Sequence, residues 1–374
     1  MSNKFATNLS CGIVGLPNVG KSTLFNALTL AQVPAENFPF CTIDPHEAVT
    51  PVPDERSGKL QKIYGSKQIV PATVTFIDIA GLVKGAAEGA GLGNRFLGHI
   101  READLILNVL RCFEDETITR SEAVDPIADY EIILSELMLK DIETIDKRLE
   151  KLAHSIKASR NKPKELVEYE KEKDFLEQIK VLIDKEDISS AQKLQKANQD
   201  FGKDLLSIKP YLIIANIAED EVDGSYKSNK HYQTLINKFG EDIVIPVSAK
   251  LEGEIVKAPE DEKESIMELF NIQEVGLPKI ISATYKTLGY VTFFTCGPQE
   301  IHCWRINKGI TVRQAAGEIH SDLERGFICA EVFNYDDLIA LGTPQAVKDA
   351  GKTRREGADY IVKDGDIILV RFNV

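Results

Sequence analysis

The feature that most constrains this 374-residue chain is a glycine-bounded segment near its start. Residues 15–23 run Gly-Leu-Pro-Asn-Val-Gly-Lys-Ser-Thr and match the phosphate-binding pattern GxxxxGK[ST] at every fixed position. A short apolar run precedes the segment, and a helical pattern begins within it. The glycines let backbone N–H groups point inward, and the helix N-terminus adds a positive dipole. The segment therefore predicts a site for the phosphates of a nucleotide.

Side chains within this loop have separate predicted roles. Lys21 is expected to reach the β- and γ-phosphates and to contribute to catalysis, while the Ser22 hydroxyl ligates Mg²⁺. The amide oxygen of Asn18 can hold a monovalent cation, K⁺, beside the phosphates. The expected nucleotide-binding residues of the loop are Asn18, Val19, Gly20, Lys21, Ser22 and Thr23. The alternative, a glycine-rich turn before a structural helix, would leave Lys21 buried without a partner.

Short apolar runs recur through the chain and are separated by helical patterns. The expected strands are residues 11–15, 74–78, 105–110, 211–215 and 243–247, with a helix over residues 22–29. Strands that are apolar at nearly every position belong to a sheet covered on both faces. The pattern predicts an α/β domain with a doubly wound, mostly parallel sheet.

The middle of the chain does not continue this alternation of strands and helices. From Met138 onward apolar residues alternate four and three positions apart, which predicts the heptad seam of a helix. Pro163 suits the first turn of a second helix, whose apolar stripe extends from Tyr169 to Ile183. Two such helices predict an antiparallel coiled-coil hairpin inserted into the sheet domain. The alternative is two amphipathic helices packed on a domain.

A third pattern begins at about Tyr290. Strands are expected over residues 291–295, 300–304 and 367–372, with a helix over residues 312–321, as in a small α+β module. The expected limits are residues 1–128 for the first part of the nucleotide-binding domain, 129–206 for the hairpin, 207–287 for the second part and 288–374 for the module.

Two further segments are placed to assist the phosphate loop. Asp78 ends an apolar run and can hold Mg²⁺ through water, while the N–H of Gly81 can sense the γ-phosphate during catalysis. Thr42 lies between the first helix and the next strand. Its hydroxyl can complete the metal shell only when a γ-phosphate is present, which would make that loop a switch.

The base-binding motif favours ATP over GTP. Guanine-selective loops carry Asn-Lys-x-Asp, whose aspartate accepts two hydrogen bonds from guanine. This chain has Asn-Ile-Ala-Glu at residues 216–219, so the lysine is missing and the carboxylate of Glu219 lies one methylene further out. Asn216 and the backbone near Ile217 can pair with an adenine edge. Ser248, Ala249 and Lys250 form the matching base-side loop.

The position that often holds a water-orienting glutamine is occupied by Leu82, which predicts slow hydrolysis. A glycine-rich run follows and ends near His99, a candidate for orienting water or acting as a general base. A solvated histidine on a helix is the alternative for His99.

In combination, these motifs closely resemble the Obg-like ATPases known as YchF proteins, over nearly the whole chain. The matching segments are residues 15–23, 37–42, 78–81 and 216–219, together with Asp-Gly-Asp-Ile-Ile at residues 364–368. The resemblance implies a Ras-like P-loop NTPase sheet with the helical hairpin inserted, and a C-terminal TGS module of β-grasp fold. It also implies ATP hydrolysis in preference to GTP, ribosome association and His99 as the catalytic histidine.

Composition adds little to these expectations. The net charge of −13 argues against a general polyanion binder, so ribosome binding and RNA contact through the hairpin and TGS module rest on the resemblance. No apolar run approaches a membrane span, and six scattered cysteines fit a reduced cytoplasm. We expect a cytoplasmic monomer.

Three functional alternatives remain: a redox role for Cys41, a GTPase instead of an ATPase, and an adaptor protein in which hydrolysis is incidental.

Overall fold

The computed structural model describes residues 9–31, 46–79, 100–114, 123–159, 161–198, 200–272 and 275–373. They form two compact units, each assembled from separate stretches of the chain. The P-loop unit contains the described parts of Ser10–Leu30 and Phe76–Gly276, and the C-terminal unit those of Ala31–Thr75 and Leu277–Val374. Among the described residues, no helix combines the length and apolarity that crossing a membrane requires.

The P-loop unit is built on a parallel sheet with strand order β4-β1-β5-β6-β7. The strands are β1 (Leu9–Val14), β4 (Thr73–Asp78), β5 (Leu105–Arg111), β6 (Tyr211–Asn216) and β7 (Val244–Val247). The pairs β1–β5, β5–β6 and β6–β7 are parallel; Leu107 of β5, for example, lies opposite Ile13 of β1 and Leu212 of β6. All seven residues of β5 are buried, as cover on both faces requires. The predicted α/β sheet is confirmed.

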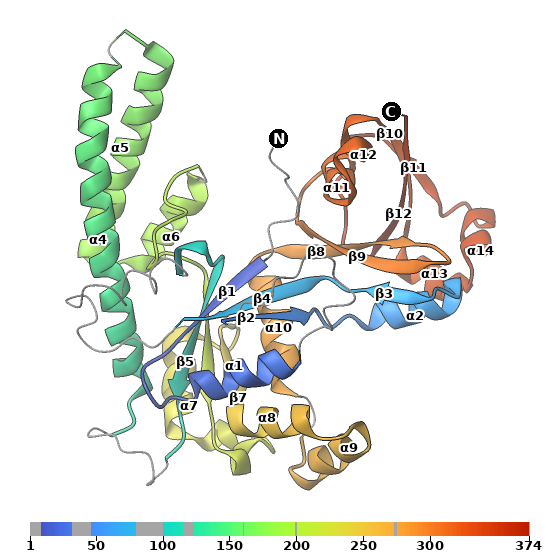
Figure 1. The fold of residues 1–374 in the computed structure, drawn as a ribbon, viewed down its shortest axis with the longest axis horizontal. Helices are drawn as coiled ribbons and strands as arrows, with labels where there is room; N and C mark the ends of the chain where they lie inside the picture. The colour runs from blue at the N-terminus through green and yellow to red at the C-terminus, as the bar shows by residue number, and fades with distance from the viewer. Residues whose placement is uncertain are drawn as a thin grey trace. The chain divides into compact units, whose positions relative to one another are not determined.

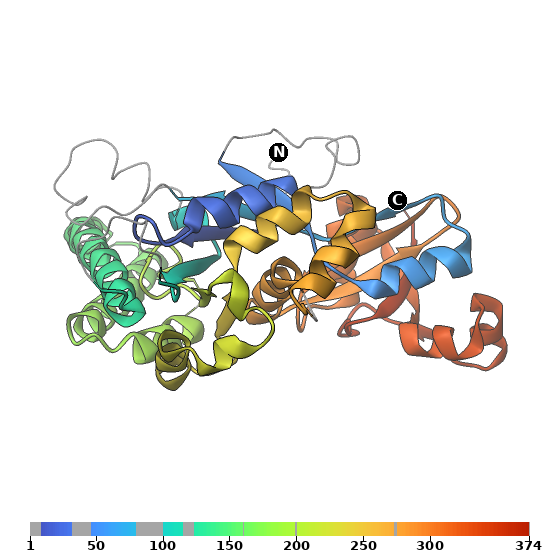
Figure 2. The same ribbon diagram turned by 90° about the horizontal axis from the view of Figure 1, so that it is seen from below.

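Helices of this unit pack on the sheet and on one another. Helix α1 (Lys21–Leu30) lies beside α8 (Ala249–Lys257), as Figure 2 shows, while α4 (Pro126–Ala158) contacts β5 and α7 (Lys230–Phe239). Tyr130 of α4 packs edge-on against Phe239 of α7, with ring centroids 4.8 Å apart. This unit also contains the short η3 (Glu219–Glu221) and η4 (Ser225–Ser228), and α9 (Glu260–Leu269).

The predicted hairpin is formed by α4 and α5 (Pro163–Asp184), which run side by side in Figure 1. Pro163 occupies the first turn of α5, as expected, and Asp125 caps α4 through the N–H groups of Ile127 and Ala128. The predicted seam supplies the hairpin core, which includes Ile145, Leu152, Leu176, Ile179 and Ile183. A third helix that the sequence did not predict, α6 (Ile188–Ala197), closes its base through Ile188 and Ala191.

A buried carboxylate joins the hairpin to the strand that follows it. Asp141 of α4 is 1% exposed. Its oxygens accept hydrogen bonds from the backbone N–H groups of Leu206 and Ser207, at 2.7 Å each, and from the Ser207 hydroxyl at 2.6 Å. Residues 206–207 lie shortly before β6, which begins at Tyr211. Asp141 therefore fixes the hairpin base to the entry of a central strand.

The C-terminal unit contains a mixed sheet with strand order β11-β10-β12-β8-β9-β3. Its strands are β3 (Gln68–Val70), β8 (Tyr290–Cys296), β9 (Glu300–Asn307), β10 (Phe327–Asn334), β11 (Arg354–Glu356) and β12 (Asp366–Phe372). Its helices are α2 (Glu55–Tyr64), α10 (Gly276–Thr287), α11 (Val312–Ile319), α12 (Ser321–Arg325), α13 (Tyr335–Leu341) and α14 (Pro344–Asp349). Val312 and Ala315 of α11 share a core with Phe293, Val332 and Ile368 of the strands, consistent with the expected β-grasp module.

Part of this unit comes from the first third of the chain, which the sequence did not indicate. Strand β3 extends the sheet by pairing in parallel with β9, placing Ile69 opposite Ile301, and α2 packs on β9. Strand β2 (Glu47–Pro51) lies beside the start of β4, where the Thr50 hydroxyl donates to the Val74 carbonyl at 3.4 Å. The C-terminal module is therefore completed by residues that precede β4 in sequence.

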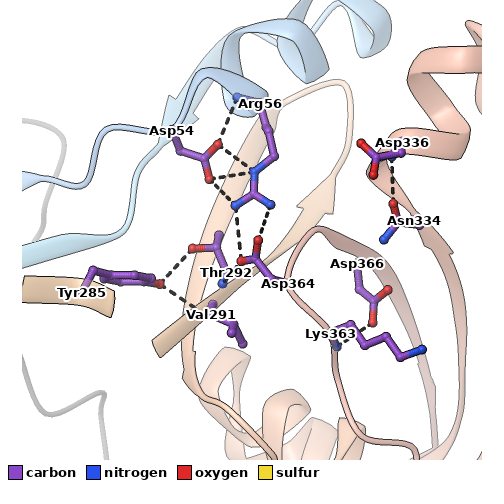
Figure 3. A network of polar contacts seen from close by, with 10 residues as sticks. All are labelled: Asp54, Arg56, Tyr285, Val291, Thr292, Asn334, Asp336, Lys363, Asp364 and Asp366. Carbon is purple, nitrogen blue, oxygen red and sulfur yellow. Dashed lines mark hydrogen bonds and ion pairs between the residues drawn. The ribbon is translucent and has the colours of Figure 1, made fainter. Parts of the chain in front are cut away.

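Arg56 of α2 holds this early segment in place (Figure 3). Its guanidinium donates to Asp54, with Nη2 to Oδ2 at 2.8 Å, and to Asp364, with Nη1 to Oδ2 at 2.7 Å. Asp364 also accepts a hydrogen bond from the N–H of Thr292 at 2.8 Å, and Arg56 lies 5.1 Å from the ring centroid of Phe294. One cation therefore joins α2 to β8 and to the turn before β12.

We expect Arg56→Met to lower the unfolding free energy of the C-terminal unit by about 1–2 kcal/mol, because it leaves Asp54 and Asp364 facing each other uncompensated. Urea denaturation followed by the fluorescence of Trp304, the single tryptophan, measures this unit. Arg371→Met is the control, since Arg371 pairs with Glu331 at 3.1 Å at the exposed end of β12. Equal stabilities for the two variants would contradict the role of Arg56.

Candidate functional site

The phosphate loop connects β1 to α1, as predicted. Two of its residues adopt left-handed backbone angles, Asn18 with φ of 64° and Gly20 with φ of 93°. A Cβ atom at Gly20 would lie 2.1 Å from Nδ2 of Asn216, and one at Gly15 would lie 2.9 Å from the carbonyl oxygen of Val109. Glycine is required at both positions because neighbouring atoms occupy the space that a side chain would need.

The structure brings two predicted site residues together at this loop. Lys21 is the first residue of α1, and its buried ammonium forms an ion pair with Asp78, the last residue of β4. The partnerless lysine of the alternative interpretation is therefore not observed. Ser22 and Thr23 are exposed in the same helical turn, so their N–H and hydroxyl groups are accessible to a ligand.

The oxygen donors at this end of the site suit Mg²⁺. The hydroxyl of Ser22 and the carboxylate of Asp78 are the hard ligands that this ion prefers. Within the described ranges, no group of three or more histidine, cysteine or acidic side chains could hold a metal unaided. Mg²⁺ would accordingly take its remaining ligands from phosphate oxygens and water, as is usual for this ion.

Asn216 organises the opposite end of the site. Its buried side chain donates from Nδ2 to the carbonyl of Val19 at 2.8 Å and accepts from the N–H of Ala249 at 3.0 Å. This side chain therefore joins the phosphate loop to the start of α8. An amide nitrogen carries two donor hydrogens, so the contact with Val19 leaves one for a base.

A pocket of about 460 Å³ extends from the phosphate loop along these residues. Nine predicted residues line it: Asn18, Gly20, Thr23, Asn216, Ile217, Glu219, Ser248, Ala249 and Lys250. Three further lining residues were not predicted: Ala218, within the base-binding motif, and Phe113 and Glu114, which follow β5. Arg111 packs over the Phe113 ring at 4.8 Å, and Glu114 lies 3.2 Å from Nε2 of His231. Their position after a central strand was the available signal, because ligands bind at the carboxyl ends of such strands.

Glu219 and Lys250 form an ion pair within this pocket. Oε1 of Glu219 lies 2.5 Å from Nζ of Lys250. Glu219 begins the short helix η3, and Lys250 lies in the first turn of α8. The carboxylate that replaces the aspartate of guanine-selective loops is therefore not isolated, a feature that the sequence did not predict.

Several predicted residues lie outside the described part of the chain. They are the proposed metal ligand Thr42, the γ-phosphate sensor Gly81, the candidate catalytic residue His99, and also Leu82 and Cys41. Their assignments stay predictions.

The loop between β1 and α1, its lysine beside the carboxylate that ends β4, and the pocket next to them define a P-loop nucleoside triphosphatase. Comparison with models of known protein families supports this class. Residues 10–168 match the family described as "50S ribosome-binding GTPase", and residues 290–373 match the C-terminal YchF-GTPase model, described as "Protein of unknown function (DUF933)". The chain belongs to the YchF family of Obg-like ATPases.

Full-length relatives support this assignment. The chain is 45% identical over 371 residues to "Ribosome-binding ATPase YchF" of Bacillus subtilis, covering 98% of this chain and all of that protein. It is 44% identical to "Obg-like ATPase 1" of Oryza sativa subsp. japonica, covering 99% of this chain and 94% of that protein. The solved structure of the Schizosaccharomyces pombe YchF GTPase matches with a TM-score of 0.82 at 37% identity, over 97% of this chain and 98% of that one. The predicted family and fold are confirmed.

Proposed function

We propose that this protein binds ATP in preference to GTP, hydrolyses it slowly and acts as a nucleotide-dependent regulatory switch on the ribosome. The observation that carries the proposal is the site itself. A complete phosphate loop pairs Lys21 with Asp78, and the base end carries Glu219, paired with Lys250, where guanine-selective loops carry an aspartate. Relatives named ribosome-binding ATPases support the enzyme class and the partner.

At the phosphate end, the N–H groups of residues 18–23 would surround the phosphate tail, and Lys21 would move from Asp78 to the β- and γ-phosphates. Ser22 would ligate Mg²⁺ directly and Asp78 through water, with Thr42 joining when a γ-phosphate is present. The ion supplies charge neutralisation between the β- and γ-phosphates. Asn18, whose backbone is already left-handed, is the candidate residue for a K⁺ site.

At the base end, Asn216, Ile217, Ser248 and Ala249 would contact adenine, together with Glu219 and Lys250, because all of them line the pocket. Gly81 and His99 would act at the scissile bond. Since Leu82 can neither donate nor accept a hydrogen bond, unassisted turnover would be slow.

The partner proposals extend beyond the nucleotide. The protein would work in the cytoplasm as a monomer that binds the ribosome, with RNA contacts through the hairpin α4–α5 and the C-terminal module. The names of relatives support ribosome binding, and the two projecting helices supply a surface for it.

Two measurements test the proposal. Competition calorimetry with ATP and GTP should show tighter ATP binding, and co-sedimentation with purified ribosomes should change with the bound nucleotide. Tighter GTP binding would instead support a GTPase, as the names of one matching family and of the fission-yeast structure suggest. Ribosome binding that is identical in every nucleotide state would support an adaptor with incidental hydrolysis.

A further inference from the structure

One buried lysine binds three backbone carbonyls near the base of the hairpin. Lys209 lies two residues before β6 and is only 9% exposed. Its ammonium donates hydrogen bonds to the carbonyl oxygens of Arg101 at 3.1 Å, Ala103 at 2.7 Å and Lys203 at 3.1 Å. An ammonium has three hydrogens, so these acceptors account for all of them. The positive charge is therefore fully hydrogen-bonded within the protein.

The three carbonyls belong to two segments that lie far apart in the sequence. Arg101 and Ala103 follow the glycine-rich run that comes after the predicted γ-phosphate sensor. Lys203 lies in the segment between α6 and β6. The carbonyl of Lys209 itself accepts a hydrogen bond from Nε2 of Gln192 in α6 at 3.2 Å. Lys209 therefore joins the segment behind the sensor to α6, the helix that closes the base of the hairpin.

The segment behind the sensor has two further attachments. Nη2 of Arg101 donates to the hydroxyl of Thr144 in α4 at 3.0 Å, which connects the segment directly to the hairpin. On the other side, the N–H of Asp104 donates to the carbonyl of Ser10 in β1 at 2.8 Å, and its carboxylate accepts from the N–H of Ser10 at 3.0 Å. The segment is therefore tied both to the strand that leads into the phosphate loop and to the hairpin.

The burial of Lys209 makes these connections stiff. If the segment moved away and Lys209 stayed in place, the ammonium would lose two partners in surroundings with little access to water. An unpaired buried charge costs more free energy than an unpaired neutral group. A displacement of Arg101 and Ala103 is therefore expected to move Lys209 as well, and with it the backbone that contacts α6.

We propose that Lys209 transmits the nucleotide state from the segment behind the γ-phosphate sensor to the base of the hairpin. When ATP replaces ADP, this segment changes position, Lys209 passes the displacement to α6, and Arg101 passes it to α4. The hairpin is the surface offered above for the ribosome, so this coupling makes ribosome binding depend on the nucleotide. The inference rests on the proposed nucleotide-dependent switch and supplies its route.

Hydrogen–deuterium exchange of the full chain with Mg²⁺ and either ADP or a non-hydrolysable ATP analogue tests this route. In wild type, peptides from α4 to α6 should exchange at rates that differ by about fivefold or more between the two states, as for a typical allosteric coupling. Lys209→Met keeps the length of the side chain and removes the ammonium, so the ratio of the two rates should fall to about one. Calorimetry should give the same affinity for the analogue, because Lys209 lies outside the described lining of the nucleotide pocket.

A second variant tests the coupling without removing a buried group. Thr144→Val keeps the shape of the side chain and removes the hydroxyl that accepts from Arg101 at an exposed contact. It should lower the rate ratio in α4 and leave the circular dichroism spectrum unchanged. Lys180→Met is the matched control, because it removes a lysine that pairs with Asp146 within the hairpin. Its rate ratio should equal that of wild type.

The outcomes separate this inference from the proposed function. If ribosome binding is the same in every nucleotide state, the proposed switch falls and the inference falls with it. If ribosome binding depends on the nucleotide but the hairpin of wild type exchanges equally in both states, only the inference is overturned. The same holds if folded Lys209→Met and Thr144→Val proteins keep the wild-type ratio, since Lys209 would then anchor the hairpin base and transmit nothing. If Lys209→Met does not fold, Thr144→Val decides.

Discussion

Replacing Lys21 with alanine should weaken ATP binding by about a hundredfold or more and reduce hydrolysis below detection. Lys21 is 8% exposed and is directed across the loop to Asp78, so its charge acts where water is largely excluded. Truncating one partner of a buried, hydrogen-bonded charge pair in a complex, here Lys21 with the phosphates, costs about 2–5 kcal/mol of binding free energy, and every 1.4 kcal/mol is a factor of ten. Calorimetry with ATP and Mg²⁺ and a phosphate-release assay measure the two losses.

The control for this variant is Lys238→Ala, because Lys238 also pairs with a carboxylate, that of Glu131, but on the outside of α7. Its ATP affinity should equal that of wild type. Circular dichroism establishes whether each variant is folded. Undiminished ATP binding by a folded Lys21→Ala protein would mean that residues 15–23 do not hold the phosphate tail.

Asp141→Asn should lower the unfolding free energy of the P-loop unit by about 2 kcal/mol or more at pH 7. The carboxylate accepts hydrogen bonds from Leu206 and Ser207 while almost fully buried, and an amide NH₂ group in its place would face donors. Urea denaturation followed by far-UV circular dichroism measures the loss. Asp146→Asn, on the same helix but half-exposed and paired with Lys180, should change stability by less than about 1 kcal/mol.

The same residue predicts a pH dependence. Burial, which outweighs the hydrogen bonds from Ser207 and Leu206, raises the pKa of Asp141 from 3.8 to about 6. The folded protein therefore holds this proton more tightly than the unfolded chain, and the stability gained below pH 4 is lost as the pH rises through about 6. The difference in stability between wild type and Asp141→Asn should narrow by up to about 3 kcal/mol over that range. A pH-independent difference would show that Asp141 titrates normally.

Elements dictated by local pattern were predictable from the sequence. Strand β5 is apolar throughout because it is buried on both faces, and Pro163 marks the first turn of α5 because its ring fits there. Strand β3 could not be predicted in the same way. It has three residues, none of them fully buried, and it becomes a strand only by pairing with β9, which lies more than 200 positions further along the chain.

The site residues show the same difference between features set by local sequence and features set by tertiary contacts. The loop motif identified Lys21 and Ser22 because GxxxxGK[ST] is a local pattern, and the position of Asp78 followed from the strand before it. The pairing of Glu219 with Lys250 depends on the adjacency of β6 and β7, and Phe113 carries no motif. Contacts between loops depend on tertiary geometry, which spacing along a single loop does not encode.

The attachment of α4 through Asp141 has a geometric consequence. From that residue to Ala158 the helix extends on the order of 25 Å, so a tilt of about 5° at the attachment would displace the far end by about 2 Å. The attachment lies at the entry of β6, and Asn216 at the exit of the same strand contacts the phosphate loop. One six-residue strand therefore connects the attachment of the hairpin to the residue that contacts the phosphate loop.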